Sequence, residues 1–165
     1  ELAGGGAIMD HTVHLADSLR WLMGSEVVEV YAQSNHILHA DKVDVETAGL
    51  LMLTFANGVF ATIDCSWSKP LNYPTWGGLT MEIISERGLT VVDAFSQNLN
   101  IFNQEPAVKS WALWGSDANQ GMVAEFVAAI RAGRATGGNG AHGYKAREIT
   151  QAGYQSAATG QPVRL

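Results

Sequence analysis

Residues 47–67 read TAGLLMLTFANGVFATIDCSW, and this stretch decides the fold. Two apolar runs, 47–56 and 59–67, lie on either side of the pair Asn57-Gly58. An Asn-Gly pair between two apolar runs is the strongest short signal for a β-hairpin, because both turn residues must accept a positive φ. The stretch therefore predicts two neighbouring antiparallel strands.

The first strand of this hairpin is apolar on both of its faces. Successive side chains of a strand point to opposite sides of the sheet, and here both sets are hydrophobic: Leu51, Leu53 and Phe55 on one side, Ala48, Leu50 and Met52 on the other. A strand of this kind is usually covered on both faces. We expect helices to cover one face, and a second sheet or a second subunit to cover the other.

The sequence around the hairpin predicts helices at both ends of the chain and more strands in the middle. Helical patterns cover residues 10–23, the stretch ending at Gly133 and residues 144–158, and strand patterns cover residues 26–36, 79–85, 89–94, 99–102, 110–114 and 162–165. We predict one α+β domain over residues 1–165, a mostly antiparallel open sheet of about six strands with helices packed on one face.

Composition excludes several classes of partner. The 165 residues are 47% hydrophobic but only 16% charged, against about 25% in an average soluble domain. The net charge of −6 argues against a phosphate-binding footprint and against an anionic membrane surface, so we expect neither nucleic acid nor membrane as a partner. The low charge also indicates a covered surface, and we expect a homo-oligomer formed through the open sheet face.

Cysteine content and the ends of the chain bear on its compartment. The single cysteine, Cys65, lies in an apolar run, which favours a buried, inert thiol over a nucleophile. No apolar stretch approaches the roughly 18 residues of a membrane span, and the N-terminus lacks the pattern of a signal peptide. We therefore expect a cytoplasmic protein. Because the chain begins with Glu1 rather than Met, we expect it to be part of a longer protein.

The first helical segment carries the most specific chemical pattern. Asp10 and His14 are four residues apart and therefore project from one helix face, with Asp17 one turn further along. A carboxylate beside an imidazole is a common acid–base pair, since histidine titrates near neutral pH. The same spacing is also typical of a helix with a solvated polar face, so spacing alone leaves both interpretations open.

Histidine pairs and glycine runs suggest metal and phosphate sites, but neither pattern is complete. Two His-x-x-His pairs occur, at 11–14 and 36–39, without a third ligand at suitable spacing, so we expect no metal. The run Gly4-Gly5-Gly6 follows no strand, and the run at 137–140 lacks the Lys-Ser/Thr of a P-loop. We expect no cofactor-binding residue in this chain.

The order and spacing of these motifs resemble the C-terminal domain of the Gfo/Idh/MocA oxidoreductases, a family that includes glucose–fructose oxidoreductase and inositol 2-dehydrogenase. The resemblance rests on segments spread over nearly the whole chain: residues 4–24, 58–67, 82–88, 125–134 and 152–157, then Thr159-Gly160 and Val163. One departure is Thr12, where many members have glycine. We expect it to cost little, although the local fit to a substrate can differ.

The resemblance implies an enzymatic role for Asp10 and His14. It places them against the nicotinamide ring and the substrate hydroxyl, where His14 takes the hydroxyl proton while a hydride passes to NAD or NADP. Asp10 would hold the imidazole or the hydroxyl in line. The substrate implied is a small polyol or sugar, including inositol, oxidised at a secondary hydroxyl.

The resemblance also implies a missing partner. In the family an N-terminal Rossmann domain binds the dinucleotide through a Gly-x-Gly-x-x-Gly turn that this chain lacks, so we expect the isolated chain to be inactive. The alternative is a non-catalytic module for oligomerisation or ligand binding. The acid–base pair favours the enzyme, whereas the missing Rossmann half favours the alternative.

Aromatic residues gather after the hairpin, where the resemblance implies the border of a substrate pocket or of a subunit contact. The candidate substrate-binding residues are Trp67, Lys69, Asn72, Tyr73 and Trp76. A sugar or cyclitol ring can stack on an aromatic face, with the lysine and asparagine supplying hydrogen bonds. Packing within the loop or at an interface accounts for the same residues equally well.

Overall fold

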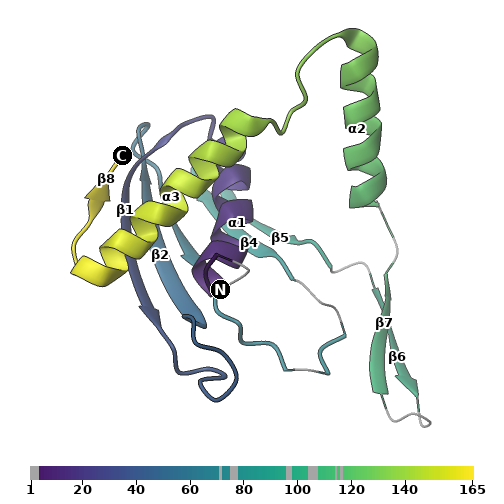
Figure 1. Cartoon of the computed structure of the whole chain (residues 1–165). Helices are drawn as coiled ribbons and strands as arrows, with labels where there is room; N and C mark the ends of the chain where they lie inside the picture. Colours follow the sequence, from purple (N-terminus) through teal and green to yellow (C-terminus); the bar gives the residue numbers. More distant parts are fainter. Residues whose placement is uncertain are drawn as a thin grey trace. The chain divides into compact units, whose positions relative to one another are not determined.

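The structure is a computed structural model that describes residues 4–70, 72–74, 78–95, 98–103, 108–113, 115 and 117–165. Along the chain, its elements are α1 (Ala7–Met23), β1 (Val27–Asn35), β2 (Ala48–Phe55), β3 (Phe60–Asp64), β4 (Thr80–Ser85), β5 (Gly88–Asp93), β6 (Asn98–Asn103), β7 (Val108–Leu113), α2 (Ala118–Ala132), α3 (Gly140–Thr159) and β8 (Val163–Arg164) (Figure 1). The chain divides into two compact units, residues 1–68 with 135–165, and residues 69–134.

The first unit is built on a four-stranded antiparallel sheet with the order β3-β2-β1-β8. The predicted hairpin is confirmed as β2 and β3, in which Leu51 pairs with Ile63. Its turn differs from the expectation. Only Gly58 has a positive φ, at +86°, while Phe55 O accepts a hydrogen bond from Gly58 N at 2.9 Å. A single left-handed glycine at the end of a tight turn closes this hairpin, and the expectation that Asn57 also has a positive φ is wrong.

The core of this unit lies between one face of the sheet and the two helices α1 and α3, which cross that face (Figure 1). It is made of one of the two apolar faces of β2 together with apolar residues of β1, β3 and both helices: Leu51, Leu53, Phe55, Val30, Ala32, Ile63, Ile8 and Ile149. Helix α3 approaches the sheet so closely that a Cβ at Gly153 would lie 2.8 Å from Leu51 Cδ2. The predicted α+β class, with helices on one face of an antiparallel sheet, is confirmed.

The other face of the sheet is apolar and exposed. Leu50, Met52 and Phe60 are 56%, 43% and 73% exposed. Burying apolar side chains such as these is the dominant favourable contribution to association between proteins. This face is therefore the one for which a covering partner is expected.

The second unit holds two hairpins, β4–β5 and β6–β7, and the helix α2. Helix α2 begins after Asp117, whose side chain accepts hydrogen bonds from Asn119 N and Gln120 N, and it ends at Gly133 in the left-handed conformation. Its apolar residues, which include Val123, Phe126 and Ile130, are exposed.

Two helices begin earlier than the sequence pattern predicts. Helix α3 begins at Gly140 rather than Tyr144, because the Asn139 side chain accepts hydrogen bonds from Ala141 N and His142 N and so caps a glycine-containing first turn. Helix α1 begins at Ala7 rather than Asp10, for a reason that lies outside its own sequence and is described below. In the described part of the chain, no helix combines the length and the apolar character that crossing a membrane requires.

Candidate functional site

The first turn of α1 is capped by a residue from a distant loop. Its N-cap position is Gly6, which has no side chain to cap the helix. Instead, Glu46 Oε1 accepts hydrogen bonds from Gly6 N and Ile8 N, both at 3.1 Å, and Glu46 O accepts one from Ala7 N at 2.9 Å. A carboxylate is favourable at this position, because helix N-termini carry unpaired amides and a partial positive charge.

Helix α3 contributes to the same cap through Tyr154. Its hydroxyl donates to Glu46 Oε1 at 2.6 Å and accepts a hydrogen bond from Gly6 N at 3.3 Å. Burial, followed by the hydrogen bond to Glu46, raises the pKa of Tyr154 to about 12. A Cβ at Gly5 would collide with the Tyr154 hydroxyl, and one at Gly6 with the Glu46 carbonyl. Glu46 and Tyr154 therefore occupy the space beside Gly5 and Gly6 that a larger side chain would need.

The predicted pair, Asp10 and His14, lies on the exposed face of α1. Asp10 Oδ2 accepts a hydrogen bond from Trp67 Nε1 at 3.1 Å and lies 3.3 Å from His11 Nε2. Within the described residues, the His14 ring has no hydrogen-bond partner, and no hydrogen bond joins it to Asp10. The helix thus brings the two side chains to one face, one turn apart, with the imidazole unengaged.

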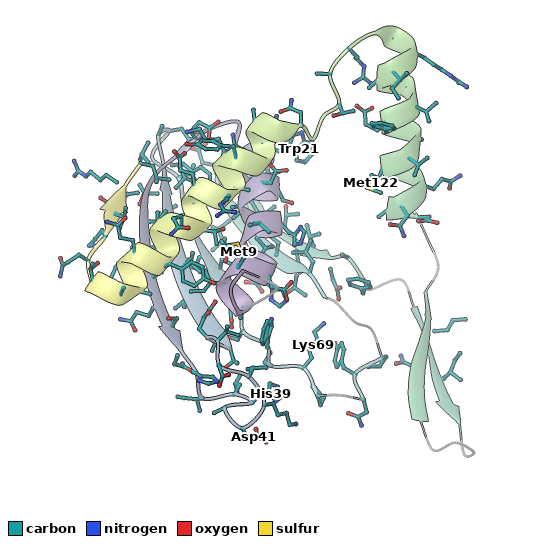
Figure 2. The ribbon with its side chains drawn as sticks, in the orientation of Figure 1. Met9, Trp21, His39, Asp41, Lys69 and Met122 are labelled. Carbon is teal, nitrogen blue, oxygen red and sulfur yellow. The ribbon has the colours of Figure 1, made fainter. Side chains whose placement is uncertain are left out.

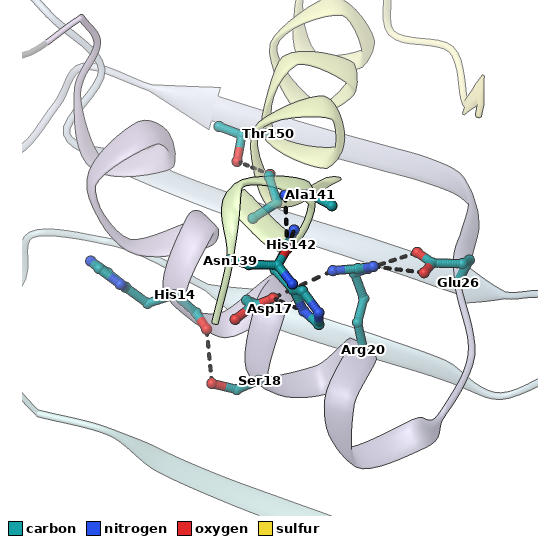
Figure 3. Close-up of polar contacts among 10 residues, drawn as sticks. His14, Asp17, Ser18, Arg20, Glu26, Asn139, Ala141, His142 and Thr150 are labelled. Carbon is teal, nitrogen blue, oxygen red and sulfur yellow. Dashed lines mark hydrogen bonds and ion pairs between the residues drawn. The ribbon is translucent and has the colours of Figure 1, made fainter. Parts of the chain in front are cut away.

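The third member of the predicted face, Asp17, belongs to an ion-pair cluster at the end of α1. Its Oδ1 lies 3.3 Å from Arg20 Nη1 and 3.5 Å from His142 Nδ1 (Figure 3). Arg20 also binds Glu26 through two contacts of 2.6 and 2.7 Å. The hydrogen bond from Arg20 lowers the pKa of Glu26, and the same bond raises the pKa of Arg20. In Figure 3 the His14 ring points away from this cluster.

The candidate substrate-binding residues separate into two groups. Trp67 belongs to the first unit, where its indole donates to Asp10. Lys69, Asn72 and Tyr73 belong to the second unit, where Lys69 Nζ lies 4.2 Å from the centroid of the Tyr73 ring. Trp76 lies outside the described residues.

Three further residues that the sequence singled out lie in surroundings that the structure describes. Cys65 is buried as predicted, and burial raises its pKa to about 11, so its thiol is a weak nucleophile. Thr12 is fully buried in the helix–sheet interface, on a different face from Asp10, so it does not form part of the exposed surface. Figure 2 shows His39, from the second histidine pair, in the β1–β2 loop.

No group of three or more His, Cys, Asp or Glu side chains is arranged to hold a metal ion in the part of the chain that the structure describes. His11, which the sequence suggested only as half of a metal pair, instead contacts Asp10 and the Cys65 carbonyl. Glu46 and Tyr154 carried no recognisable signal in the sequence, because their partners are 40 and 148 residues away from them.

Comparisons with known proteins identify relatives for the whole chain. Residues 1–91 match the model of the GFO/IDH/MocA C-terminal domain. The chain is 29% identical to the uncharacterized oxidoreductase YrbE of Bacillus subtilis, over 98% of this chain and 48% of that protein. It is 28% identical to the inositol 2-dehydrogenase of Acidothermus cellulolyticus, over 91% of this chain and 44% of that protein. The chain therefore spans about half the length of the curated relatives it matches.

Solved structures share the fold. GenD2 from gentamicin A biosynthesis, in complex with NAD, is 26% identical with a TM-score of 0.80, over 98% of this chain and 48% of that one. The myo-inositol 2-dehydrogenase of Lactobacillus plantarum, 22% identical with a TM-score of 0.74 over 97% and 48% of the two chains, supports the fold alone. With more than half of its residues matching the family model, this chain belongs to the Gfo/Idh/MocA family of oxidoreductases and corresponds to its C-terminal domain.

Proposed function

We propose that this chain is the substrate-binding and catalytic half of an NAD- or NADP-dependent oxidoreductase, acting on a secondary hydroxyl of a sugar, an inositol or a related polyol. One observation carries the proposal: an exposed helix face presents His14, whose ring has no hydrogen-bond partner among the residues that the structure describes, one turn from an Asp10 carboxylate. An unengaged imidazole on an accessible surface is free to take up a proton from a bound substrate.

His14 is the proposed general base. One of its ring nitrogens accepts the proton of the substrate hydroxyl, while the carbon that bears this hydroxyl loses a hydride and becomes a carbonyl carbon. The nicotinamide ring, when bound, supplies the acceptor for that hydride. Asp10 accepts a hydrogen bond from the hydroxyl or from the imidazolium that forms, and so stabilises the positive charge that develops on His14.

The dinucleotide itself is proposed to bind to a Rossmann domain outside this chain. The first glycine run of the chain does not fit a pyrophosphate, because the amides that begin the helix after it, Gly6 N, Ala7 N and Ile8 N, are already bonded to Glu46 and Tyr154. A pyrophosphate needs free amides at a helix N-terminus. We therefore expect this chain alone neither to bind NAD or NADP tightly nor to oxidise a polyol.

The substrate class rests on the relatives and on the candidate ligands. Two curated relatives are inositol 2-dehydrogenases by name, with 28% identity to this chain. Lys69, Asn72, Tyr73 and Trp76 are the proposed contacts for the remaining hydroxyls and for a ring face, as the resemblance suggests. We assign the protein to the cytoplasm, following its low cysteine content.

The direct test replaces His14 by alanine in the protein that joins this chain to its nucleotide-binding half. We expect kcat for polyol oxidation to fall by about 10²–10⁴, the usual contribution of a positioned acid–base group. The melting temperature should stay unchanged, because the side chain is exposed. A variant that keeps the wild-type kcat, or that loses activity only by unfolding, would contradict the assignment.

The exposed sheet face supports the alternative function, a non-catalytic module for oligomerisation or ligand binding. We propose that this face mediates homo-oligomerisation whether or not the protein is an enzyme. Leu50, Met52 and Phe60 lie on that face and are 43–73% exposed. Light scattering of the chain should show a dimer or a larger assembly, which the Leu50→Asp substitution should dissociate. A monomer of 17.6 kDa at high concentration would contradict this part of the proposal.

A further inference from the structure

The Asp10 carboxylate is held through only one of its oxygens. Oδ2 accepts the indole N–H of Trp67 at 3.1 Å and lies 3.3 Å from His11 Nε2. Oδ1 has no hydrogen-bond partner among the residues that the structure describes. One side of this carboxylate is therefore fixed, and the other is open.

The position of Trp67 is set by the sheet rather than by a free loop. Beyond the end of β3 the chain continues to pair with the start of β2, since Cys65 N donates to Gly49 O at 3.0 Å and Trp67 N donates to Thr47 O at 2.8 Å. Both bonds continue the antiparallel ladder. The indole N–H is only a donor, so it fits an acceptor-only carboxylate.

His11 links Asp10 to the same segment. Its Nδ1 lies 3.0 Å from the Cys65 carbonyl oxygen, while its Nε2 faces Asp10 Oδ2. A carbonyl and a carboxylate both only accept hydrogen bonds, so a ring N–H of His11 can donate to either of them. His11 thus bridges Asp10 and the segment that follows β3.

We propose that Trp67 and His11 are positioning residues that hold Asp10 through Oδ2, so that Oδ1 is presented to the substrate hydroxyl or to His14. This inference rests on the proposed function for its catalytic meaning. The contacts themselves are testable without activity.

The first experiment uses NMR on this chain. The indole N–H resonance of Trp67 should shift in Asp10→Ala, which removes its acceptor. The indole of Trp21, which is 80% exposed at the end of α1, serves as the internal control and should not respond (Figure 2). A Trp67 resonance that is insensitive to Asp10→Ala would overturn the proposal.

The second experiment measures kinetics in the protein that joins this chain to its nucleotide-binding half. Trp67→Phe keeps the ring and removes the N–H, and we expect kcat to fall about tenfold with KM nearly unchanged, as for the loss of a hydrogen bond to a charged group. The control Trp21→Phe should leave both unchanged. A Trp67→Phe variant with a raised KM and the wild-type kcat would instead make Trp67 a substrate-binding residue.

His11→Ala tests the second contact to Asp10 Oδ2. We expect kcat to fall, by less than in Trp67→Phe, with KM nearly unchanged. His36→Ala, at an exposed loop histidine, should leave both unchanged. A His11→Ala variant with the wild-type kcat would overturn the positioning role of His11. If Asp10→Ala keeps full activity while its NMR effects appear, the proposed function fails and the contacts stand.

Discussion

Both ends of helix α1 are anchored by carboxylates, and the two anchors differ in their surroundings. At the start, Glu46 accepts two backbone amides and the Tyr154 hydroxyl through a single oxygen in a partly buried position. At the end, Arg20 binds Glu26, whose side chain is 56% exposed. Hydrogen bonds to a charged group away from water contribute more to stability than an ion pair in water. The start of the helix should therefore be the stronger anchor.

The candidate site lies between these anchors, and the contrast explains why it is free to act. Polar groups at both ends are satisfied within the fold, whereas the described structure leaves His14 and Asp10 Oδ1 without partners. A site on a helix held at both ends keeps its geometry when a substrate binds. The following substitutions test how unequal the two anchors are.

The largest effect is expected from Glu46→Ala. It removes the acceptor of two helix amides and of the Tyr154 hydroxyl, and we expect the free energy of unfolding to fall by about 2–3 kcal/mol. Urea unfolding of the chain measures this loss. Glu46→Gln retains an amide oxygen as acceptor and should lose less than half as much.

Glu86→Ala is the matched control, because Glu86 is an exposed carboxylate in the turn between β4 and β5. We expect its effect to stay within about 0.5 kcal/mol, as for other surface substitutions. Equal losses for Glu46→Ala and Glu86→Ala would remove the distinction between the partly buried anchor and an ordinary surface carboxylate.

The two ends of α1 also differ in how far the sequence predicts them. The ends of the helices were predictable, because Gly24, Gly133 and Gly160 follow their helices in the left-handed conformation that glycine favours. The start of α1 was not, because its cap is a tertiary contact with a residue 40 positions away. Local patterns encode local hydrogen bonds, and a cap supplied by another segment leaves no pattern in the helix itself.

One part of the candidate site was likewise predictable from the sequence, and another part was not. Spacing of four residues was enough to place Asp10 and His14 on one face of a helix. The contact between Trp67 and Asp10 was not predictable, because it depends on how far strand pairing continues beyond β3. The resemblance to the family suggested Trp67 as a substrate ligand, and only the folded chain brings its indole to the carboxylate.

A smaller effect is expected from Tyr154→Phe, which removes one hydroxyl from the partly buried anchor at Glu46. We expect a loss of about 1 kcal/mol at pH 7, typical of one hydrogen bond. The pH dependence has a definite sign. Because folding raises the pKa of Tyr154 from 10 to about 12, the stability from its neutral form is complete below pH 10 and is lost as the pH rises toward 12.

Ultraviolet absorbance measures this titration directly. The difference between the titration curves of the chain and of Tyr154→Phe should show one tyrosine that ionises near pH 12. Tyr144→Phe, at a side chain that is 65% exposed, controls for the loss of a tyrosine. A difference curve with its midpoint near pH 10 would show that Tyr154 is not held in a desolvated contact with Glu46.

The smallest effect is expected at the exposed anchor, from Glu26→Gln. The hydrogen bond from Arg20 lowers the pKa of Glu26 in the folded chain, so the stability from this pair is present above the unfolded value near 4.5 and is lost as the pH falls through the folded value. Solvent screening around Glu26 limits the loss at pH 7 to about 0.5–1 kcal/mol. Urea unfolding at pH 7 should show that difference between the wild-type chain and Glu26→Gln, and at pH 2–3 the difference should vanish because both side chains are then uncharged.

High salt should reduce the difference at pH 7, since salt screens exposed charges far more than buried ones. A loss at Glu26 as large as that of Glu46→Ala, and unaffected by salt, would show that the two ends of α1 are held equally strongly.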